Sequence, residues 1–136
     1  MNNIILDTHI LLWSFLSPNE ISKEVTEAIS GAQDDSRLFI SSITLWEIAM
    51  LVNKKRINLF EPTLTFLNSI SQAKGLNIVS ISTSIAADSG NLLNFHGDPA
   101  DRIITATTRE LAGHLITKDE KILTWAKEGY MKTING

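Results

Sequence analysis

The chain has 136 residues, 43% of them hydrophobic, and a formal net charge of −3 at pH 7. This length and composition favour one domain, residues 1–136, whose core is large enough to fold without disulfide bonds. The absence of cysteine excludes disulfide frameworks, thiolate metal sites and cysteine nucleophiles, and it fits a reducing compartment. There is no basic leader segment, and no apolar run approaches the roughly 18 residues of a membrane span. We therefore expect a cytoplasmic protein that does not contact a membrane.

Short apolar runs alternate with segments of helical periodicity along the chain. In order, the sequence predicts a strand at 3–6, a helix at 10–16, a helix at 21–29 stopping near Gly31, a strand at 38–40 and a helix at 42–52. The sequence then predicts a helix that opens at 61–62 and ends near Gly75, a strand at 77–81 and a helix at 83–93. The last predicted elements are a helix at 99–112, a strand at 114–117, a helix through 122–125 and a strand at 131–134. This alternation predicts an α/β fold, a three-layer α/β/α sandwich with a central, mainly parallel sheet.

The helix at 99–112 has clear signals at both ends. Asp98 and Pro99 form a typical N-cap followed by proline at the first helical position, and Gly113 stands where helices often end in the left-handed conformation. Asp101 lies three residues after the cap. Acids at these two positions commonly stabilise free N–H groups and the helix dipole, and this simple interpretation fits Asp98 well.

Three further acids follow predicted strands. Asp7 comes directly after the first strand and Asp119 after the strand at 114–117, whereas Glu47 is the only charged residue between 38 and 52. Asp7 could merely cap the next helix, as Thr8 also could, and Glu47 could lie at a solvent edge. However, the carboxyl ends of parallel strands meet at one edge of a sheet, so all three can converge there with Asp101. Clustered carboxylates repel unless a cation neutralises them, and oxygen ligands indicate Mg²⁺ or Mn²⁺.

Other polar residues have weaker signals. The basic cluster Lys54, Lys55 and Arg56 is either a solvated surface or a set of phosphate contacts. The histidines His9, His96 and His114 are candidates for a general base, although a lone histidine is more often structural.

Four motifs, taken in order, resemble those of the PIN domain family and, more narrowly, of the VapC-type toxin ribonucleases. They are Leu6-Asp7-Thr8, Ser42-Ile-Thr-Leu-Trp-Glu47-Ile-Ala, Asp98-Pro-Ala-Asp101-Arg-Ile-Ile-Thr-Ala and Leu115-Ile-Thr117-Lys-Asp119. The resemblance implies that the matching acids, Asp7, Glu47, Asp101 and Asp119, are catalytic and bind Mg²⁺ or Mn²⁺ for RNA hydrolysis. Thr8 and Thr117 match small polar positions beside the metal. His96, Asp98 and Arg102 match a subgroup pattern whose catalytic need is undetermined.

The resemblance also implies partners. It predicts a metal-dependent endoribonuclease that leaves a 5′-phosphate and a 3′-hydroxyl, is neutralised by a cognate antitoxin and forms a homodimer. The complex would bind operator DNA only through the antitoxin. The net charge of −3 does not argue against RNA binding, because the four acids carry a formal charge of −4 and the rest of the chain is therefore slightly positive. Basic residues flanking the site, Lys54, Lys55, Arg56, Arg102 and Lys118, are candidates for RNA contacts.

Three other interpretations remain open. A phosphate-accepting receiver domain also has acids at strand ends and binds Mg²⁺, but it normally has paired acids after the first strand, where this chain has Asp7 alone. A haloacid-dehalogenase-type phosphatase requires Asp-x-Asp there, and Asp7-Thr8-His9 lacks the second acid. The third interpretation is a catalytically silent binding module whose acids are all helix caps.

Overall fold

Five short strands form a single sheet at the centre of the molecule. The computed structural model describes residues 1–136. The strands are β1 (Ile4–Leu6), β2 (Leu38–Ser41), β3 (Leu76–Val79), β4 (His114–Thr117) and β5 (Lys132–Asn135). Their order is β3-β2-β1-β4-β5, and every neighbouring pair is parallel. The predicted parallel sheet is therefore confirmed.

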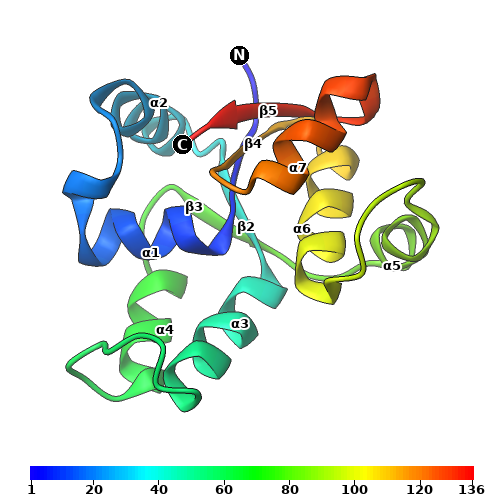
Figure 1. The fold of residues 1–136 in the computed structure, drawn as a ribbon. Helices are drawn as coiled ribbons and strands as arrows, with labels where there is room; N and C mark the ends of the chain where they lie inside the picture. The colour runs from blue at the N-terminus through cyan, green and yellow to red at the C-terminus, as the bar shows by residue number, and fades with distance from the viewer.

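Helices cover both faces of this sheet. They are α1 (Thr8–Leu16), α2 (Lys23–Asp34), α3 (Ser42–Asn53), α4 (Thr63–Ser71), α5 (Thr83–Asn91), α6 (Pro99–Glu110) and α7 (Glu120–Trp125). Figure 1 shows α1 to α4 on one side of the sheet and α5 to α7 on the other. A one-turn 3-10 helix at Pro18–Glu20 and a π-helical turn at Ala126–Tyr130 complete the chain. The α/β/α sandwich is confirmed, and no helix is long and apolar enough to cross a membrane.

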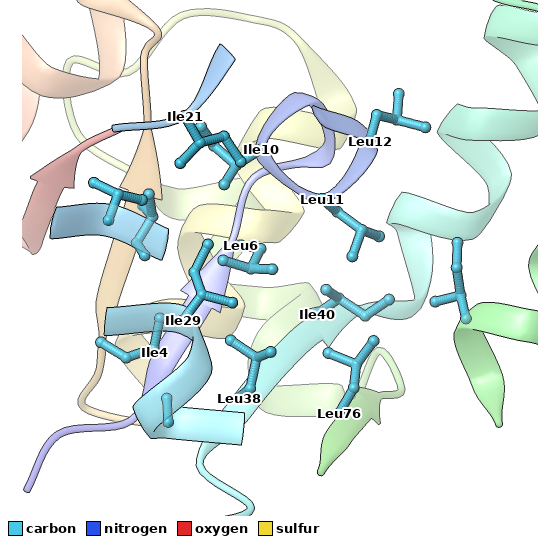
Figure 2. Packing of buried hydrophobic residues seen from close by; sticks show 14 of the residues in the cluster. Ile4, Leu6, Ile10, Leu11, Leu12, Ile21, Ile29, Leu38, Ile40 and Leu76 are labelled. Atoms are coloured by element: carbon cyan, nitrogen blue, oxygen red, sulfur yellow. The ribbon is translucent and has the colours of Figure 1, made fainter. Parts of the chain in front are cut away.

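The two halves of the core follow from the alternation of side chains along each strand. In β1, Ile4 and Leu6 contribute to the core under α1 to α4, whereas Ile5 contributes to the core under α5 to α7. Figure 2 shows Ile4 and Leu6 grouped with apolar side chains of β2, α1 and α2. The middle strand is buried on both faces, which explains its uninterrupted apolar sequence.

The order of the strands reverses direction next to β1. The chain moves from β1 to β2 and β3 in one direction, and α5 and α6 then carry it back across the sheet to β4 on the other side of β1. Open parallel sheets bind ligands where the strand order reverses in this way, at the carboxyl ends of the strands. In this fold that position lies between the ends of β1 and β4.

Several predicted boundaries are wrong by a few residues. Helix α2 continues past Gly31 to Asp34. A glycine inside a helix costs about 1 kcal/mol of stability, which is less than the burial of the apolar face of this helix contributes. Helix α4 ends at Ser71, well before Gly75, which adopts a φ of 83° after the turn. Strand β3 ends at Val79 rather than residue 81, because its partner Ser41 is the last residue of β2.

The end of α6 also differs from the prediction. The left-handed residue is Ala112, with a φ of 49°, and not Gly113. The N–H of Gly113 donates to the carbonyl of Thr108 and that of Ala112 to the carbonyl of Arg109, which is a Schellman motif. Gly113 is required for a different reason. A Cβ there would lie 2.4 Å from Cδ1 of Ile5 and 2.8 Å from the carbonyl oxygen of Asn3.

Candidate functional site

Four acids from four elements meet at the carboxyl edge of the sheet. Asp7 and Asp119 follow the adjacent strands β1 and β4, Glu47 lies on the second turn of α3 after β2, and Asp101 lies in the first turn of α6. Their proximity is evident in the electrostatics, since the charges of Asp7, Asp119 and Glu47 all raise the pKa of Asp101. The structure thus brings together the four acids that the sequence singled out.

Asp7 is buried and held through both carboxylate oxygens. Its Oδ1 accepts the N–H of Thr8 at 2.9 Å, so it does cap α1, and its Oδ2 accepts the hydroxyl of Thr117 at 2.6 Å. Burial raises the pKa of Asp7 above its usual value, although both hydrogen bonds oppose this shift. The capping role therefore accounts for only one of the two oxygens.

Glu47 is fixed by a short chain of hydroxyl groups. Thr8 donates its hydroxyl to Oε1 of Glu47, and the hydroxyl of Thr44 lies 3.1 Å from that of Thr8. Because the Thr8 proton is used on Glu47, Thr44 supplies the proton between the two threonines. Burial raises the pKa of Glu47, with a smaller contribution from Asp7. Glu47 therefore does not lie free at a solvent edge.

Asp98 and Asp101 have different roles in the local structure. Oδ1 of Asp98 accepts the N–H of Asp101 at 3.0 Å, so Asp98 is the N-cap of α6, as predicted. The reciprocal bond of a capping box, from the N–H of Asp98 to the Asp101 side chain, is not made, because that N–H donates to Nδ1 of His96. Burial, followed by the charges of Asp7, Asp98, Asp119 and Glu47, raises the pKa of Asp101 to about 8. Asp101 faces the other acids.

Thr117 connects Asp7 with Asp119. Its hydroxyl donates to Asp7 and accepts the N–H of Asp119 at 3.0 Å. Oδ1 of Asp119 in turn accepts the N–H groups of Lys121 and Ile122, so Asp119 caps α7. The capping bonds use one carboxylate oxygen of Asp119, and a ligand atom of this side chain lies within 4.8 Å of one of Asp101.

His96 lies at the rim of the acid cluster. Its Nε2 is buried, is 3.4 Å from Oδ2 of Asp101, and makes no regular hydrogen bond. Suitable ligand atoms of His96, Asp101 and Asp119 all lie within 4.8 Å of one another. However, Nδ1 of His96 accepts the N–H of Asp98 at 3.3 Å, which leaves the imidazole proton on Nε2. A protonated Nε2 has no free lone pair and so is not a metal ligand.

The basic residues divide into two groups. Lys54 and Arg56, after the end of α3, line a hollow that also contains Glu47 and Asp98. Lys55 lines a second hollow, which Arg56 also borders. Lys118 donates to the carbonyl of Glu20 at 3.0 Å and lies over the ring of Trp13, so its charge is directed elsewhere.

Arg102 does not match the expectation that it contacts RNA. Its guanidinium donates to five backbone carbonyls, those of Ser89, Gly90, Leu92, Phe95 and His96. All five N–H groups are therefore used, and none remains for a phosphate. Arg102 instead fastens the segment that carries His96 to α6.

The remaining histidines lie apart from His96. His114 opens β4, at the opposite end of that strand from Asp119, so the suggestion that it acts as a base at this site is wrong. His9 is exposed on the first turn of α1, and its charge lowers the pKa values of Asp7 and Glu47. The sequence analysis overlooked Thr44. Its spacing three residues before Glu47 places the two side chains on one face of α3 and could have revealed it.

The arrangement agrees with a family model. The model of the PIN domain matches residues 4–127, a span that contains all four acids. The chain belongs to the PIN domain family. It is 35% identical over 123 residues to Ribonuclease VapC22 of Mycobacterium tuberculosis, covering 90% of this chain and 91% of that protein.

Solved structures support the same PIN fold. A toxin-antitoxin complex from Klebsiella pneumoniae contains a chain that is 25% identical, with a TM-score of 0.62 and coverage of 97% of this chain and 96% of that one. VapBC2 from Rickettsia felis, bound to a promoter DNA fragment, matches with a TM-score of 0.70 at 16% identity, with 98% of each chain covered. DNA-bound VapBC from Salmonella typhimurium matches with a TM-score of 0.66 at 18% identity, again with 98% of each chain covered.

Proposed function

We propose that this PIN domain is a divalent-metal-dependent endoribonuclease that acts as the toxin of a toxin–antitoxin pair. The observation that carries the proposal is the cluster of Asp7, Glu47, Asp101 and Asp119 at the carboxyl edge of the sheet, beside β1 and β4. None of these acids forms an ion pair with a lysine or arginine. The relative named a ribonuclease, at 35% identity over nearly its whole length, supports RNA as the substrate.

The donor set fits Mg²⁺ or Mn²⁺. Carboxylate oxygens are the ligands that these hard cations prefer. Burial, followed by repulsion from the neighbouring acids, raises the pKa of Asp101, and a bound cation would offset both effects. When bound, the cation supplies a water of lowered pKa and neutralises charge on the scissile phosphate. Asp7, Glu47, Asp101 and Asp119 would hold it.

The side chains around the acids position them. Thr117 orients Asp7 and Thr8 orients Glu47, whereas Nε2 of His96 lies 3.4 Å from Oδ2 of Asp101 without a regular hydrogen bond. Because both threonine hydroxyls donate to carboxylates, neither is available as a nucleophile, which leaves water to attack the phosphate. We expect a 5′-phosphate and a 3′-hydroxyl as products.

The comparisons also support partners for this chain. Two of the similar structures are complexes bound to DNA, and one is a toxin-antitoxin complex. We propose that a cognate antitoxin neutralises this protein, that the chain forms a homodimer, and that operator DNA is bound through the antitoxin alone.

Cleavage of RNA by the purified chain tests the enzyme proposal. We expect cleavage with Mg²⁺ or Mn²⁺, no cleavage in EDTA, and recovery when the metal is added back. Asp101→Asn should be inactive, whereas Asp98→Asn, which keeps the cap, should remain active. Undiminished cleavage in EDTA would exclude the metal mechanism. An inactive parent that folds and binds metal would favour a silent binding module.

Expression in bacteria tests the toxin proposal separately. The parent chain expressed alone should arrest growth, and Asp7→Asn should not, because the amide keeps the shape but removes a metal-binding charge. Protein amounts must be matched by blotting. Equal arrest by both chains would argue that toxicity does not come from nuclease activity.

A further inference from the structure

A groove lies beside the acid cluster, between α3 and the first turn of α6. It encloses about 230 Å³ and is lined on one side by a stripe of α3 that contains Trp46, Met50 and Lys54, spaced four residues apart. Asp98 and Pro99 form the opposite wall. The groove is continuous with the site, because Glu47 belongs to its lining.

Trp46 is the residue of this stripe that we consider further, because its side chain does not pack in the core. Its neighbours Leu45 and Ile48 pack into the core, whereas Trp46 belongs to neither half of the core and is 55% exposed. A single exposed apolar residue needs no explanation. An exposed indole that lines a groove next to a proposed phosphodiester-cleaving site is a more specific arrangement.

The groove carries three kinds of chemistry along α3. Glu47, with Asp98 opposite, provides acids near the start of the helix, Trp46 and Met50 provide apolar surface, and Lys54 and Arg56 provide positive charge beyond its end. From Trp46 to Lys54 the helix rises by about 12 Å. Aromatic surface flanked by positive charge is the usual platform for unpaired nucleotides, whose bases stack on the ring while their phosphates contact lysine or arginine.

We propose that this groove is a subsite for the unpaired nucleotide adjacent to the scissile phosphate of the RNA. The base stacks on Trp46, and the phosphate beyond it contacts Lys54 and Arg56. The inference rests on the proposed nuclease function, because it places the scissile phosphate at the acids. It adds that base stacking on Trp46 contributes to the selection of the substrate.

Charge favours RNA over a peptide segment in this groove. A strand of RNA lying along α3 brings its phosphates to Lys54 and Arg56 at one end and to the metal-loaded acids at the other. Lys54 and Arg56 form no ion pair within the chain, so their charges are available to a ligand.

Fluorescence anisotropy with labelled oligonucleotides tests the subsite. All proteins carry Asp101→Asn to prevent cleavage and are measured in Mg²⁺ with oligoadenylate, oligouridylate and an abasic strand of equal length. Adding Trp46→Ala should weaken binding of oligoadenylate roughly 5- to 100-fold, and Trp46→Phe should restore most of it. The abasic strand should bind both proteins equally. Phe60→Ala is the matched control, since Phe60 is 90% exposed but lies outside this groove.

Two further measurements separate stacking from charge. Lys54→Ala should reduce the salt dependence of binding by about one phosphate contact without changing the preference for oligoadenylate. In the active background, Trp46→Ala should raise KM for a single-stranded substrate while kcat stays within about 2-fold.

The outcomes distinguish this inference from the proposed function. Equal affinity of the Trp46→Ala and parent proteins for oligoadenylate overturns the subsite, even if the parent cleaves RNA. Trp46-dependent binding without any cleavage by the active chain supports the subsite and overturns the nuclease. If Trp46→Ala leaves RNA affinity unchanged but converts a dimer to a monomer in sedimentation, or abolishes binding of an antitoxin, the groove is a protein interface and the inference is wrong.

Discussion

Without a divalent cation, the stability of this protein should fall as the pH rises between about 4 and about 8. The cause is Asp101, whose carboxyl has an ordinary pKa of 3.8 when exposed and a pKa of about 8 in the folded chain. In this window the folded state binds one more proton than the unfolded state, so the free energy of unfolding decreases with pH. The stability is fully present below pH 3.8 and is lost as the pH rises through the folded pKa.

The structure limits the size of this effect. Each unit of pKa difference corresponds to about 1.4 kcal/mol, so the full shift of Asp101 would amount to about 6 kcal/mol. The side chain is 16% exposed, and salt screens the neighbouring acids, which reduces the expected loss to about 2–3 kcal/mol. Burial raises the pKa values of Asp7 and Glu47 in the same direction. The loss is large compared with a typical total stability of about 5–15 kcal/mol.

The assay is urea unfolding in EDTA at a series of pH values, for the parent and for Asp101→Asn. The variant cannot ionise at this position, so its advantage should be small near pH 4 and should grow to about 2–3 kcal/mol at pH 8. Glu27→Gln is the control, because it removes a carboxylate from an exposed face of α2 outside the site. Its difference from the parent should not vary in this way.

Magnesium provides the complementary half of the experiment. A ligand that binds only the native state stabilises it by mass action, so Mg²⁺ should raise the stability of the parent more than that of Asp101→Asn. An advantage of the variant that does not change with pH would refute the electrostatic reasoning. An equal response of both proteins to Mg²⁺ would mean that Asp101 is not a ligand.

Three further predictions concern the scaffold and are checked by thermal and urea unfolding. Asp98→Ala should lower the free energy of unfolding by about 0.5–2 kcal/mol. Asp98→Asn should lower it by much less, because asparagine also caps helices, and equal losses would exclude the capping role. Arg102→Lys should cost about 2–4 kcal/mol, since an ammonium cannot reach five carbonyls, and should raise proteolysis near His96. Gly31→Ala should stabilise the protein by about 0.5–1 kcal/mol, because an alanine Cβ there meets only open space and favours the helix. Gly113→Ala should destabilise the protein by about 1–3 kcal/mol, because a Cβ there would collide with Ile5 and Asn3, and changes of the opposite sign would contradict this reasoning.

The layers and the edge of the site could be predicted because they depend on local periodicity. Each strand is a short apolar run and each helix has an apolar face, and parallel strands necessarily share one carboxyl edge. That edge placed Asp7 and Asp119 near each other, although 112 positions separate them in the sequence. Helix ends were less predictable, because neither glycine acts through the preference of glycine for turns: Gly31 lies inside α2 with open space around it, and Gly113 is required by its close contact with Ile5 and Asn3.

The partners of His96, Arg102 and Lys118 could not be predicted for a different reason. Arg102 and Lys118 bind backbone carbonyls, and Nδ1 of His96 binds a backbone N–H. Every residue carries such groups, so the sequence contains no pattern that identifies which of them will face a given side chain. The course of the backbone at 89–98 decides it for His96 and Arg102, and the position of Glu20 decides it for Lys118. The raised pKa of Asp101 was partly predictable, because the charges of neighbouring acids add to the effect of burial, which the sequence does not give.

The choice of hydrogen-bond donors around the acids supports a cation as their missing partner. Asp7, Glu47 and Asp119 are fixed by neutral donors, the hydroxyls of Thr8 and Thr117 and backbone N–H groups. A lysine or arginine would stabilise these carboxylates more strongly, yet Arg102 and Lys118 are directed to backbone carbonyls, and neither Lys54 nor Arg56 forms an ion pair with an acid. The arrangement therefore fixes the positions of the carboxylates while preserving their charge. An acid cluster serving only stability would gain from internal ion pairs, whereas one that binds a divalent cation must keep its charge free for that ion.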